Sequence, residues 1–265
     1  MSHFKQVVLF SFKSDAKKVA KISEVIESAG VSIIDEVFMS KADLIIVMGG
    51  DGTMLHQAKI AYQYNIPILG INDGHTGFLA DIEYSNASSV LKAILEGHYF
   101  EDYRTVFECM FSGEKHIAIN ELMLSKSQAN RMIRYEVFVD ERFMYNQTGD
   151  GLIVSTATGS TAYALSAGGQ IIHPEVDVMS LVPICPRHLS ARPVIIPSSS
   201  NVVLNIQKWK GSCTNISIDG KEIEVIESLS NIQIKCSEKK LKLIHPLHYD
   251  FYQTLHSKLN WETNS

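Results

Sequence analysis

Short apolar runs alternate with longer amphipathic stretches up to about residue 100 of the chain. The short runs are typical of buried strands, and the longer stretches repeat apolar side chains at the spacing of one helix face. Strands that alternate with helices in this way indicate parallel βαβ units. The pattern predicts an α/β domain with a parallel sheet, its strands at 5–12, 31–37, 42–48 and 67–71 and its helices at 15–30, 53–64 and 83–97.

Beyond residue 100 the chain changes to short β-rich runs separated by turn residues, a texture typical of antiparallel sheets. We expect strands at 105–111, 114–124, 134–140, 151–156, 190–196, 201–207, 215–218 and 230–235. The two patterns together predict an α/β domain over 1–100 and a β-rich, antiparallel and sandwich-like domain over 101–240. The segment 241–265 is expected to pack back on the first domain, with a final helix around Phe251 and Leu255.

Composition and charge narrow the class of protein. The 265 residues are 45% hydrophobic, enough for a substantial core, and the net charge of −5 offers no basic field for broad nucleic-acid binding. The apolar start at 7–12 is too short for a membrane span, and it lacks a signal-peptide h-region with a small-residue cleavage site. The four cysteines lie far apart without metal-ligand spacing and are expected to be reduced thiols. We therefore expect a cytoplasmic, globular enzyme that binds neither nucleic acid nor membranes.

An apolar run at 44–48 ends abruptly in Gly-Gly-Asp-Gly-Thr at 49–53, and helical spacing follows. Glycines let the backbone approach a ligand closely, and a helix N-terminus presents N–H groups and a favourable dipole to an anion. Phosphate binding leaves Asp51 unexplained, because a fixed negative charge beside phosphates is unfavourable unless it holds a metal ion or accepts a proton. The structural alternative is a tight turn in which Asp51 caps the helix, although three glycines in four residues exceed what a cap requires.

Two further segments carry candidate ligand-binding groups. At 149–163 a strand again ends in glycine and small hydroxyl residues, and Tyr163 follows just inside a helix-like stretch, where a flat ring can stack on a base. The alternative for this segment is a hydroxyl-rich β-hairpin turn. Asn120 and Glu121 follow the apolar 117–119, although a glutamate at a strand end is usually a solvated surface residue.

Five motifs resemble, in order and spacing, those of the NAD kinases over residues 40–225. They are Gly-Gly-Asp-Gly-Thr at 49–53, Gly-His-Thr-Gly-Phe-Leu at 74–79, Asn-Glu at 120–121, Asp150 with Thr-Gly-Ser-Thr-Ala-Tyr at 158–163, and Leu-Ser-Ala-Arg-Pro at 189–193. The first motif is shared with diacylglycerol-type lipid kinases, whereas the third and fourth are far more particular to the NAD kinases. The resemblance implies transfer of the γ-phosphate of ATP to the 2′-hydroxyl of the adenosine ribose of NAD, which yields NADP.

The resemblance also implies a role for individual residues. Asp51 matches the general base that takes the proton from the attacking ribose hydroxyl. Phosphoryl transfer depends mainly on positioning and charge neutralisation, so such a base accepts the proton late. The other residues implied to contact nucleotides are Gly50, Gly52 and Thr53 at the phosphates, Asn120 and Glu121 at ribose hydroxyls and base, Asp150 near the second nucleoside, Thr161, Ala162, Tyr163 and Ser166 around the nucleobases, Phe78 on the adenine side, and His56 facing the phosphates.

The chain departs from the family pattern at a few positions. Asp73 stands where relatives often have arginine, which removes a positive charge beside the phosphates, Thr76 where leucine is common, and Gln170 where proline is frequent. Cys185 has two interpretations, a pocket residue across a subunit boundary or a buried apolar cysteine. We favour the second.

Cofactor and partners follow from the resemblance. Mg²⁺ is expected to arrive with ATP, because no cluster of carboxylates stands out as a cage, and no residue is assigned to a metal. Most of the ten histidines, His245 among them, are expected to be ordinary surface or packing residues. A homodimer or a homotetramer is implied. A lipid kinase of the diacylglycerol or sphingosine type and a non-catalytic NAD(P)-sensing module are the alternative functions.

Overall fold

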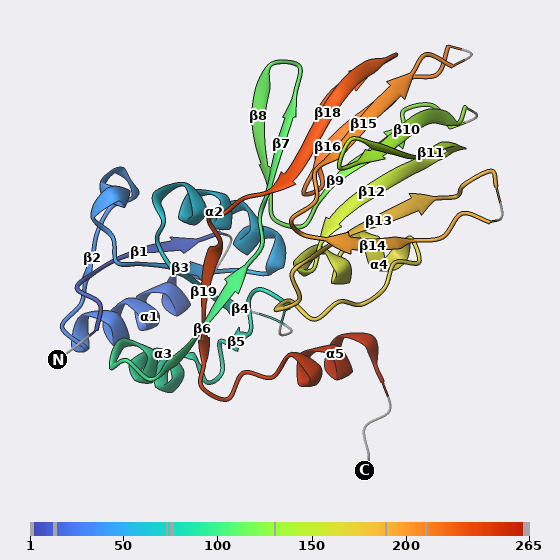
Figure 1. The fold of residues 1–265 in the computed structure, drawn as a ribbon. Helices are drawn as coiled ribbons and strands as arrows, with labels where there is room; N and C mark the ends of the chain where they lie inside the picture. The colour runs from blue at the N-terminus through green and yellow to red at the C-terminus, as the bar shows by residue number, and fades with distance from the viewer. Residues whose placement is uncertain are drawn as a thin grey trace. The chain divides into compact units, whose positions relative to one another are not determined.

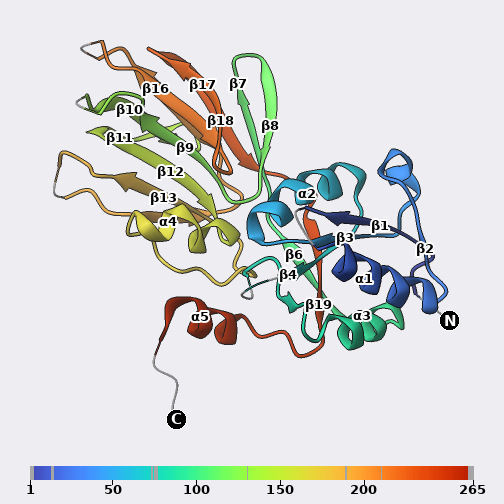
Figure 2. The same ribbon diagram turned by 180° about the vertical axis from the view of Figure 1, so that it is seen from behind.

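The structure is a computed structural model that describes residues 3–12, 15–72, 74, 77–129, 131–188, 190–209 and 211–261. It divides into two units, one formed by Met1–Tyr103 with Leu241–Ser265 and the other by Arg104–Lys240. The first, called the α/β unit, surrounds a sheet with helices, whereas the second, called the β unit, consists mostly of strands (Figure 1, Figure 2). The predicted order of an α/β part followed by a β-rich part is confirmed.

A seven-stranded sheet forms the centre of the α/β unit, in the order β2-β1-β3-β4-β19-β6 with β5 beside β4. The neighbours β1 and β2, β1 and β3, β3 and β4, β4 and β5, and β4 and β19 are parallel. Strand β3 is buried along its whole length, as an apolar run between two layers of helices requires. The strands are β1 (Gln6–Ser11), β2 (Ser32–Ile33), β3 (Leu44–Met48), β4 (Ile68–Asn72), β5 (Ile82–Glu83), β6 (Tyr99–Arg104) and β19 (Leu241–Pro246).

Helices cover both faces of this sheet. Ile22 of α1 and Leu91 of α3 join Leu44 and Ile46 of β3 in one buried cluster, so these two helices share a face. Helix α2 lies on the opposite face (Figure 1). Among the described residues, no helix is both long enough and apolar enough to cross a membrane. The helices are α1 (Ala16–Ser28), α2 (Asp51–Tyr64), α3 (Ala87–Leu95) and α5 (Phe251–Leu259), with a 3-10 helix η1 (Glu36–Lys41).

The α/β unit differs from the sequence prediction in two places. The strand expected at 31–37 keeps only Ser32–Ile33, because the Asp35 carboxylate accepts a hydrogen bond from the Val37 N–H and starts η1. The C-terminal segment does more than pack against the sheet, since β19 inserts between β4 and β6. Strands β5 and β6 were also not predicted.

The β unit consists of two six-stranded antiparallel sheets, in the orders β11-β10-β15-β18-β7-β8 and β14-β13-β12-β9-β16-β17. Side chains from both sheets form one buried cluster, and the Tyr135 hydroxyl of β10 donates a 3.0 Å hydrogen bond to the Gly151 carbonyl of β12. The strands are β7 (Phe107–Phe111), β8 (Glu114–Ala118), β9 (Glu121–Lys126), β10 (Ile133–Val139), β11 (Arg142–Gly149), β12 (Gly151–Thr156), β13 (Val178–Ile184), β14 (Val194–Pro197), β15 (Val202–Gln207), β16 (Thr214–Ile218), β17 (Lys221–Ile226) and β18 (Leu229–Cys236).

The run predicted as one strand at 114–124 is two strands, because the chain passes from one sheet to the other between β8 and β9. Three strands were not predicted. Strands β11 and β17 lie at sheet edges and carry many polar side chains, and β13 contains Pro183, which argues against a central strand. Two short helical segments, η2 (Thr158–Thr161) and α4 (Tyr163–Ser166), follow β12, and Ala164 of α4 packs on Ile153 and Val182.

Candidate active site

The Asp51 carboxylate is fixed by the backbone of a distant turn. Its Oδ2 accepts a 2.8 Å hydrogen bond from the Phe78 N–H, and its Oδ1 accepts bonds of 2.9 and 3.0 Å from the Leu79 and Ala80 N–H groups. A 2.7 Å bond from the Gly77 N–H to the Ala80 carbonyl closes this turn. Three donors of the main chain therefore complement one negative charge and hold its orientation.

Asp51 does not cap the helix as the structural alternative required. Helix α2 begins at Asp51, its N-cap is Gly50, and no side chain makes a capping hydrogen bond there. The cap interpretation is wrong, because the carboxylate points at the turn 77–80 instead of at its own helix. The fit is close, since a Cβ atom at Gly77 would lie only 2.0 Å from Asp51 Oδ1.

The glycines at the start of α2 differ from one another. A Cβ atom at Gly49 would lie 2.9 Å from Thr53 Cβ, so packing within the chain requires that glycine. At Gly50 and Gly52 a Cβ atom would meet nothing within 4 Å, and neither residue has a positive φ. Neither the backbone conformation nor the packing requires glycine at these two positions. Open space at an uncapped helix N-terminus suits an anion that approaches the backbone.

A cavity of about 320 Å³ lies beside this helix start, bounded mainly by Phe10, Phe12, Gly52, Thr53, His56 and Gln57. His56 is exposed there. The predicted phosphate-side residues Gly50, Gly52, Thr53 and His56 thus lie together around the first turn of α2. The cavity has aromatic side chains on its walls and a helix N-terminus at its edge. A helix N-terminus favours phosphate groups, and aromatic walls favour the flat or apolar part of the same ligand.

Phe78, predicted on the adenine side, is half-buried, and its ring centroid lies 6.4 Å from that of Phe251 in α5. Gly74 of the same motif donates its N–H to Asn72 Oδ1. Asp73, His75 and Thr76, and Leu189 of the fifth motif, lie outside the described residues.

The backbone at Asn120 and Glu121 is held by a residue from a distant hairpin. Asp219 Oδ1 accepts bonds of 3.1, 2.7 and 3.2 Å from the N–H groups of Ile119, Asn120 and Glu121, and Asp219 Oδ2 accepts one of 3.1 Å from Ile119. Asp219 sits at φ +50° in the turn between β16 and β17. The Asp-Gly pair at 219–220 is a turn signal, but the sequence contains no sign of this contact.

Glu121 is only 6% exposed, so the interpretation as a solvated surface residue is wrong. It starts β9 with its backbone paired to β12, which places the side chain in the interior. Asn120 is half-buried at the crossing from β8 to β9. The predicted pair therefore occupies a constrained position.

The segment after β12 is helical, so the β-hairpin alternative is also wrong. Thr156 Oγ1 accepts a hydrogen bond from the Gly159 N–H and donates one of 2.7 Å to the Ile119 carbonyl. A Cβ atom at Gly159 would lie 2.2 Å from the Asn120 carbonyl oxygen. The β unit thus brings the start of the motif 158–163 directly against Asn120.

Tyr163, at the start of α4, is 50% exposed and presents its ring to solvent. Thr161 and Ala162 beside it are half-buried, and Ser166 at the end of α4 is exposed. A buried arginine that the sequence patterns did not indicate, Arg104, donates from Nη1 to Thr158 Oγ1 at 3.3 Å. An exposed ring on a well-anchored turn is suited to stacking on a base.

Asp150 lies apart from this group. It precedes β12, whereas the motif 158–163 follows it, and six residues of strand separate the two by roughly 20 Å. Its Oδ2 makes a 2.8 Å ion pair with Lys126 Nζ, a partner that sequence reasoning missed.

Cys185 lies near Asp150, whose N–H donates to the Ile184 carbonyl. The interpretation of Cys185 as a buried apolar cysteine is wrong, because it is exposed at φ +41°. None of the four cysteines, all of which lie in the described ranges, forms a disulfide. Burial raises the pKa of the Cys236 thiol to about 12, which keeps it protonated and inert.

Two protein-family models match the chain. The model described as the ATP-NAD kinase N-terminal domain matches residues 5–99, and the model of the ATP-NAD kinase C-terminal domain matches residues 119–246. Among curated proteins, the NAD kinase of Erwinia tasmaniensis is 45% identical over 225 residues, which are 83% of this chain and 77% of that protein. The NAD kinase of Coxiella burnetii is 42% identical over 227 residues, 84% of this chain and 76% of that protein.

Solved structures share the fold. Yeast NADH kinase complexed with NADH superposes with a TM-score of 0.86 at 23% identity, covering 98% of this chain and 89% of that one. An NAD kinase from Archaeoglobus fulgidus in complex with ATP gives a TM-score of 0.82 at 24% identity, covering 97% of this chain and 100% of that one.

Proposed function

This chain belongs to the ATP-NAD kinase family, and we propose that it transfers the γ-phosphate of ATP to the 2′-hydroxyl of the adenosine ribose of NAD, which yields NADP. The observation that carries the proposal is the Asp51 carboxylate, fixed at the start of α2 beside two glycines that face open space. The names of the curated relatives support NAD as the acceptor.

Asp51 would act as the general base through Oδ2. An ionised carboxylate offers about four acceptor positions. The backbone donors use two on Oδ1 and one on Oδ2, so Oδ2 retains a position for the ribose hydroxyl. Because phosphoryl transfer depends on in-line positioning, the value of the three N–H bonds lies in holding that oxygen still while the hydroxyl attacks.

The donor phosphates would lie against the first turn of α2. Gly50 and Gly52 let the phosphate oxygens approach the backbone N–H groups, and the helix dipole favours their negative charge. Thr53 and the exposed His56 line the adjoining cavity and would contact the same ligand. This arrangement neutralises charge on the transferring group, which is the main requirement of the reaction.

Asn120 and Glu121 would hydrogen-bond the ribose hydroxyls and base of the dinucleotide. The bonds from their backbone to Asp219 support this role, because they hold the main chain at both positions before a ligand binds, which lowers the cost of ordering it on binding. The exposed ring of Tyr163 would stack on a base, with Thr161, Ala162 and Ser166 around it and Phe78 on the adenine side.

Mg²⁺ would be carried by the triphosphate of ATP. Within the ranges that the structure describes, no group of three or more histidine, cysteine, aspartate or glutamate side chains is arranged to hold a metal ion. Phosphate oxygens are natural ligands of Mg²⁺, so we expect the ion to arrive with the nucleotide.

We further propose a homo-oligomer, a dimer or a tetramer, located in the cytoplasm. Asp150 and Cys185 lie at the opposite end of β12 from the motif 158–163, so a second copy is needed if both ends are to contact one nucleoside. Exposed apolar side chains on the β unit, such as Phe143 and Val225, are compatible with contact between copies. Light scattering tests the oligomeric state. A reducing compartment such as the cytoplasm is consistent with four cysteines that form no disulfide.

The activity is tested by incubating the protein with NAD, ATP and Mg²⁺ and detecting NADP with a dehydrogenase that accepts only NADP. NADP formation supports the proposal. Phosphate transfer to diacylglycerol or sphingosine but not to NAD would instead indicate a lipid kinase, and tight NAD binding without product would indicate a sensor.

Asp51→Asn tests the role of the base. The amide keeps the shape of the side chain but cannot accept the hydroxyl proton, so turnover is expected to be lost while NAD binding is largely kept. Calorimetry of NAD binding provides the control for folding. Retained turnover in this variant would refute the assignment.

A further inference from the structure

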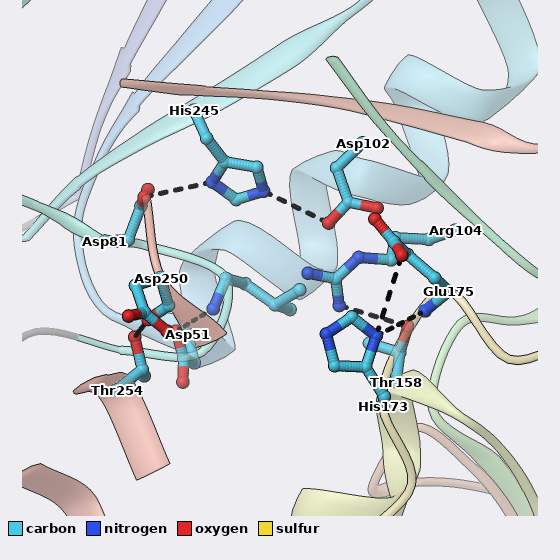
Figure 3. A network of polar contacts seen from close by, with 11 residues as sticks. Asp51, Asp81, Asp102, Arg104, Thr158, His173, Glu175, His245, Asp250 and Thr254 are labelled. Atoms are coloured by element: carbon cyan, nitrogen blue, oxygen red, sulfur yellow. Dashed lines mark hydrogen bonds and ion pairs between the residues drawn. The ribbon is translucent and has the colours of Figure 1, made fainter. Parts of the chain in front are cut away.

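His245 lies at the centre of a buried polar cluster in the α/β unit (Figure 3). Its Nδ1 is 3.0 Å from Asp81 Oδ2, and its Nε2 is 3.4 Å from Asp102 Oδ2. The three side chains are 1%, 6% and 4% exposed, respectively. His245 is therefore not the ordinary surface or packing residue expected from the sequence, because its imidazole bridges two buried carboxylates from different parts of the chain.

Aromatic rings fix the orientation of this imidazole. The Tyr249 ring stacks on it with centroids 4.0 Å apart and planes 13° from parallel, and Phe100 adds a more distant stacked contact at 6.5 Å. A ring held in this plane keeps one nitrogen directed at each carboxylate. The imidazole can donate to both carboxylates when both of its nitrogens carry a proton.

The contact with Asp81 reaches the Asp51 carboxylate through the backbone. Asp81 follows directly after Ala80, whose N–H donates to Asp51 Oδ1 and whose carbonyl accepts the Gly77 N–H that closes the turn. On its other side Asp81 adjoins β5, where Ile82 pairs with β4. The His245 bond thus anchors the residue at which the turn 77–80 joins the sheet.

We propose that His245 is a positioning residue that acts through Asp81 on the turn that orients Asp51, a role that rests on the proposed function of Asp51 as base. A buried carboxylate without a partner is costly, so loss of the imidazole drives Asp81 to move toward water. The turn moves with it, and its N–H groups no longer hold Asp51 Oδ2 in one place. A displacement of about 1 Å at reacting groups is enough to slow an enzyme about a hundredfold.

Two substitutions of His245 separate this role from simple packing. In His245→Asn the side-chain amide takes the place of Nδ1 and still donates to Asp81, whereas in His245→Gln the longer side chain carries its amide toward Asp102. Both remove the ring and its stacking on Tyr249, so they form a matched pair. His245→Gln is expected to lower kcat about tenfold to a hundredfold with small changes in KM for ATP and NAD, and His245→Asn to keep most of kcat.

Hydrogen exchange provides a readout that does not need turnover. The amides of residues 78–80 are expected to lose protection in His245→Gln and to keep it in His245→Asn. If His245→Gln does not fold, Asp81→Ala replaces it, because it removes the acceptor of the His245 bond, with the same expected fall in kcat and in protection. His248→Gln, at an exposed histidine three positions further along, serves as the neutral control.

The outcomes distinguish this inference from the proposed function. Equal kcat values for the two His245 variants, or a loss of thermal stability without a fall in kcat, would overturn the positioning role. Wild-type protein that makes no NADP would refute the function instead, while the exchange experiment would still test the contact between His245 and the turn.

Discussion

The substitution Gly52→Ala tests whether glycine is needed at this position for binding a ligand or for the stability of the fold. Gly52 is the second residue of α2, it has no positive φ, and an added Cβ atom would meet nothing within 4 Å. Alanine is more favourable than glycine inside a helix by about 1 kcal/mol, so the free energy of unfolding is expected to rise by up to that amount. For a chain of this size the corresponding increase in Tm is about 2–4 °C.

The same methyl group occupies the space through which phosphates would approach the backbone of α2. It would hold them about 1 Å or more away from the N–H groups, and kcat/KM for ATP is expected to fall about a hundredfold. The affinity for NAD should change little. A substitution that stabilises the free protein and removes activity is expected only where a glycine serves a ligand.

The assay combines thermal denaturation, initial rates of NADP formation at varied ATP, and calorimetry of NAD binding. Gly49→Ala is the matched control, because its Cβ would lie 2.9 Å from Thr53 Cβ and the variant should lose stability. If Gly52→Ala kept the wild-type kcat/KM for ATP, the proposed position of the phosphates at the first turn of α2 would be refuted. A lower Tm of Gly52→Ala would refute the conclusion that a Cβ atom at this position meets no neighbouring atom.

Three more predictions follow from contacts in the two units. Asp219→Asn replaces an acceptor oxygen by a donor facing main-chain N–H groups, so KM for NAD should rise about tenfold with a smaller change in KM for ATP; unchanged initial-rate kinetics would contradict this. Gly77→Ala would place a methyl group 2.0 Å from Asp51 Oδ1, so both Tm and kcat should fall, and a stable, active variant would disprove the contact. Because burial raises the pKa of the Cys236 thiol to about 12, it remains protonated at pH 8, and iodoacetamide should modify the exposed Cys185 first, as mass spectrometry of the digest would show. Equal rates of modification would argue against this burial.

Local patterns predicted the elements around the glycine turn. The apolar run that became β3 lies in the middle of a sheet and is apolar on both faces, and the glycines that follow stop the strand and start α2. Such features depend on neighbours in the chain, so they can be seen without a structure. The edge strands β11 and β17 could not be seen in this way, because a strand exposed on one side carries polar residues and its pairing depends on a partner.

The order of an α/β part and a β-rich part, the motifs of the family and the candidate residues can all be derived from the chain without its structure. The partners that hold those residues become visible in the folded chain: the turn 77–80 for Asp51, Asp219 for Asn120, and Asp81 for His245. These partners lie between 27 and 164 positions apart in the chain. Periodicity reports only contacts within one helix or strand, whereas contacts at such separations arise when packed sheets bring distant turns together.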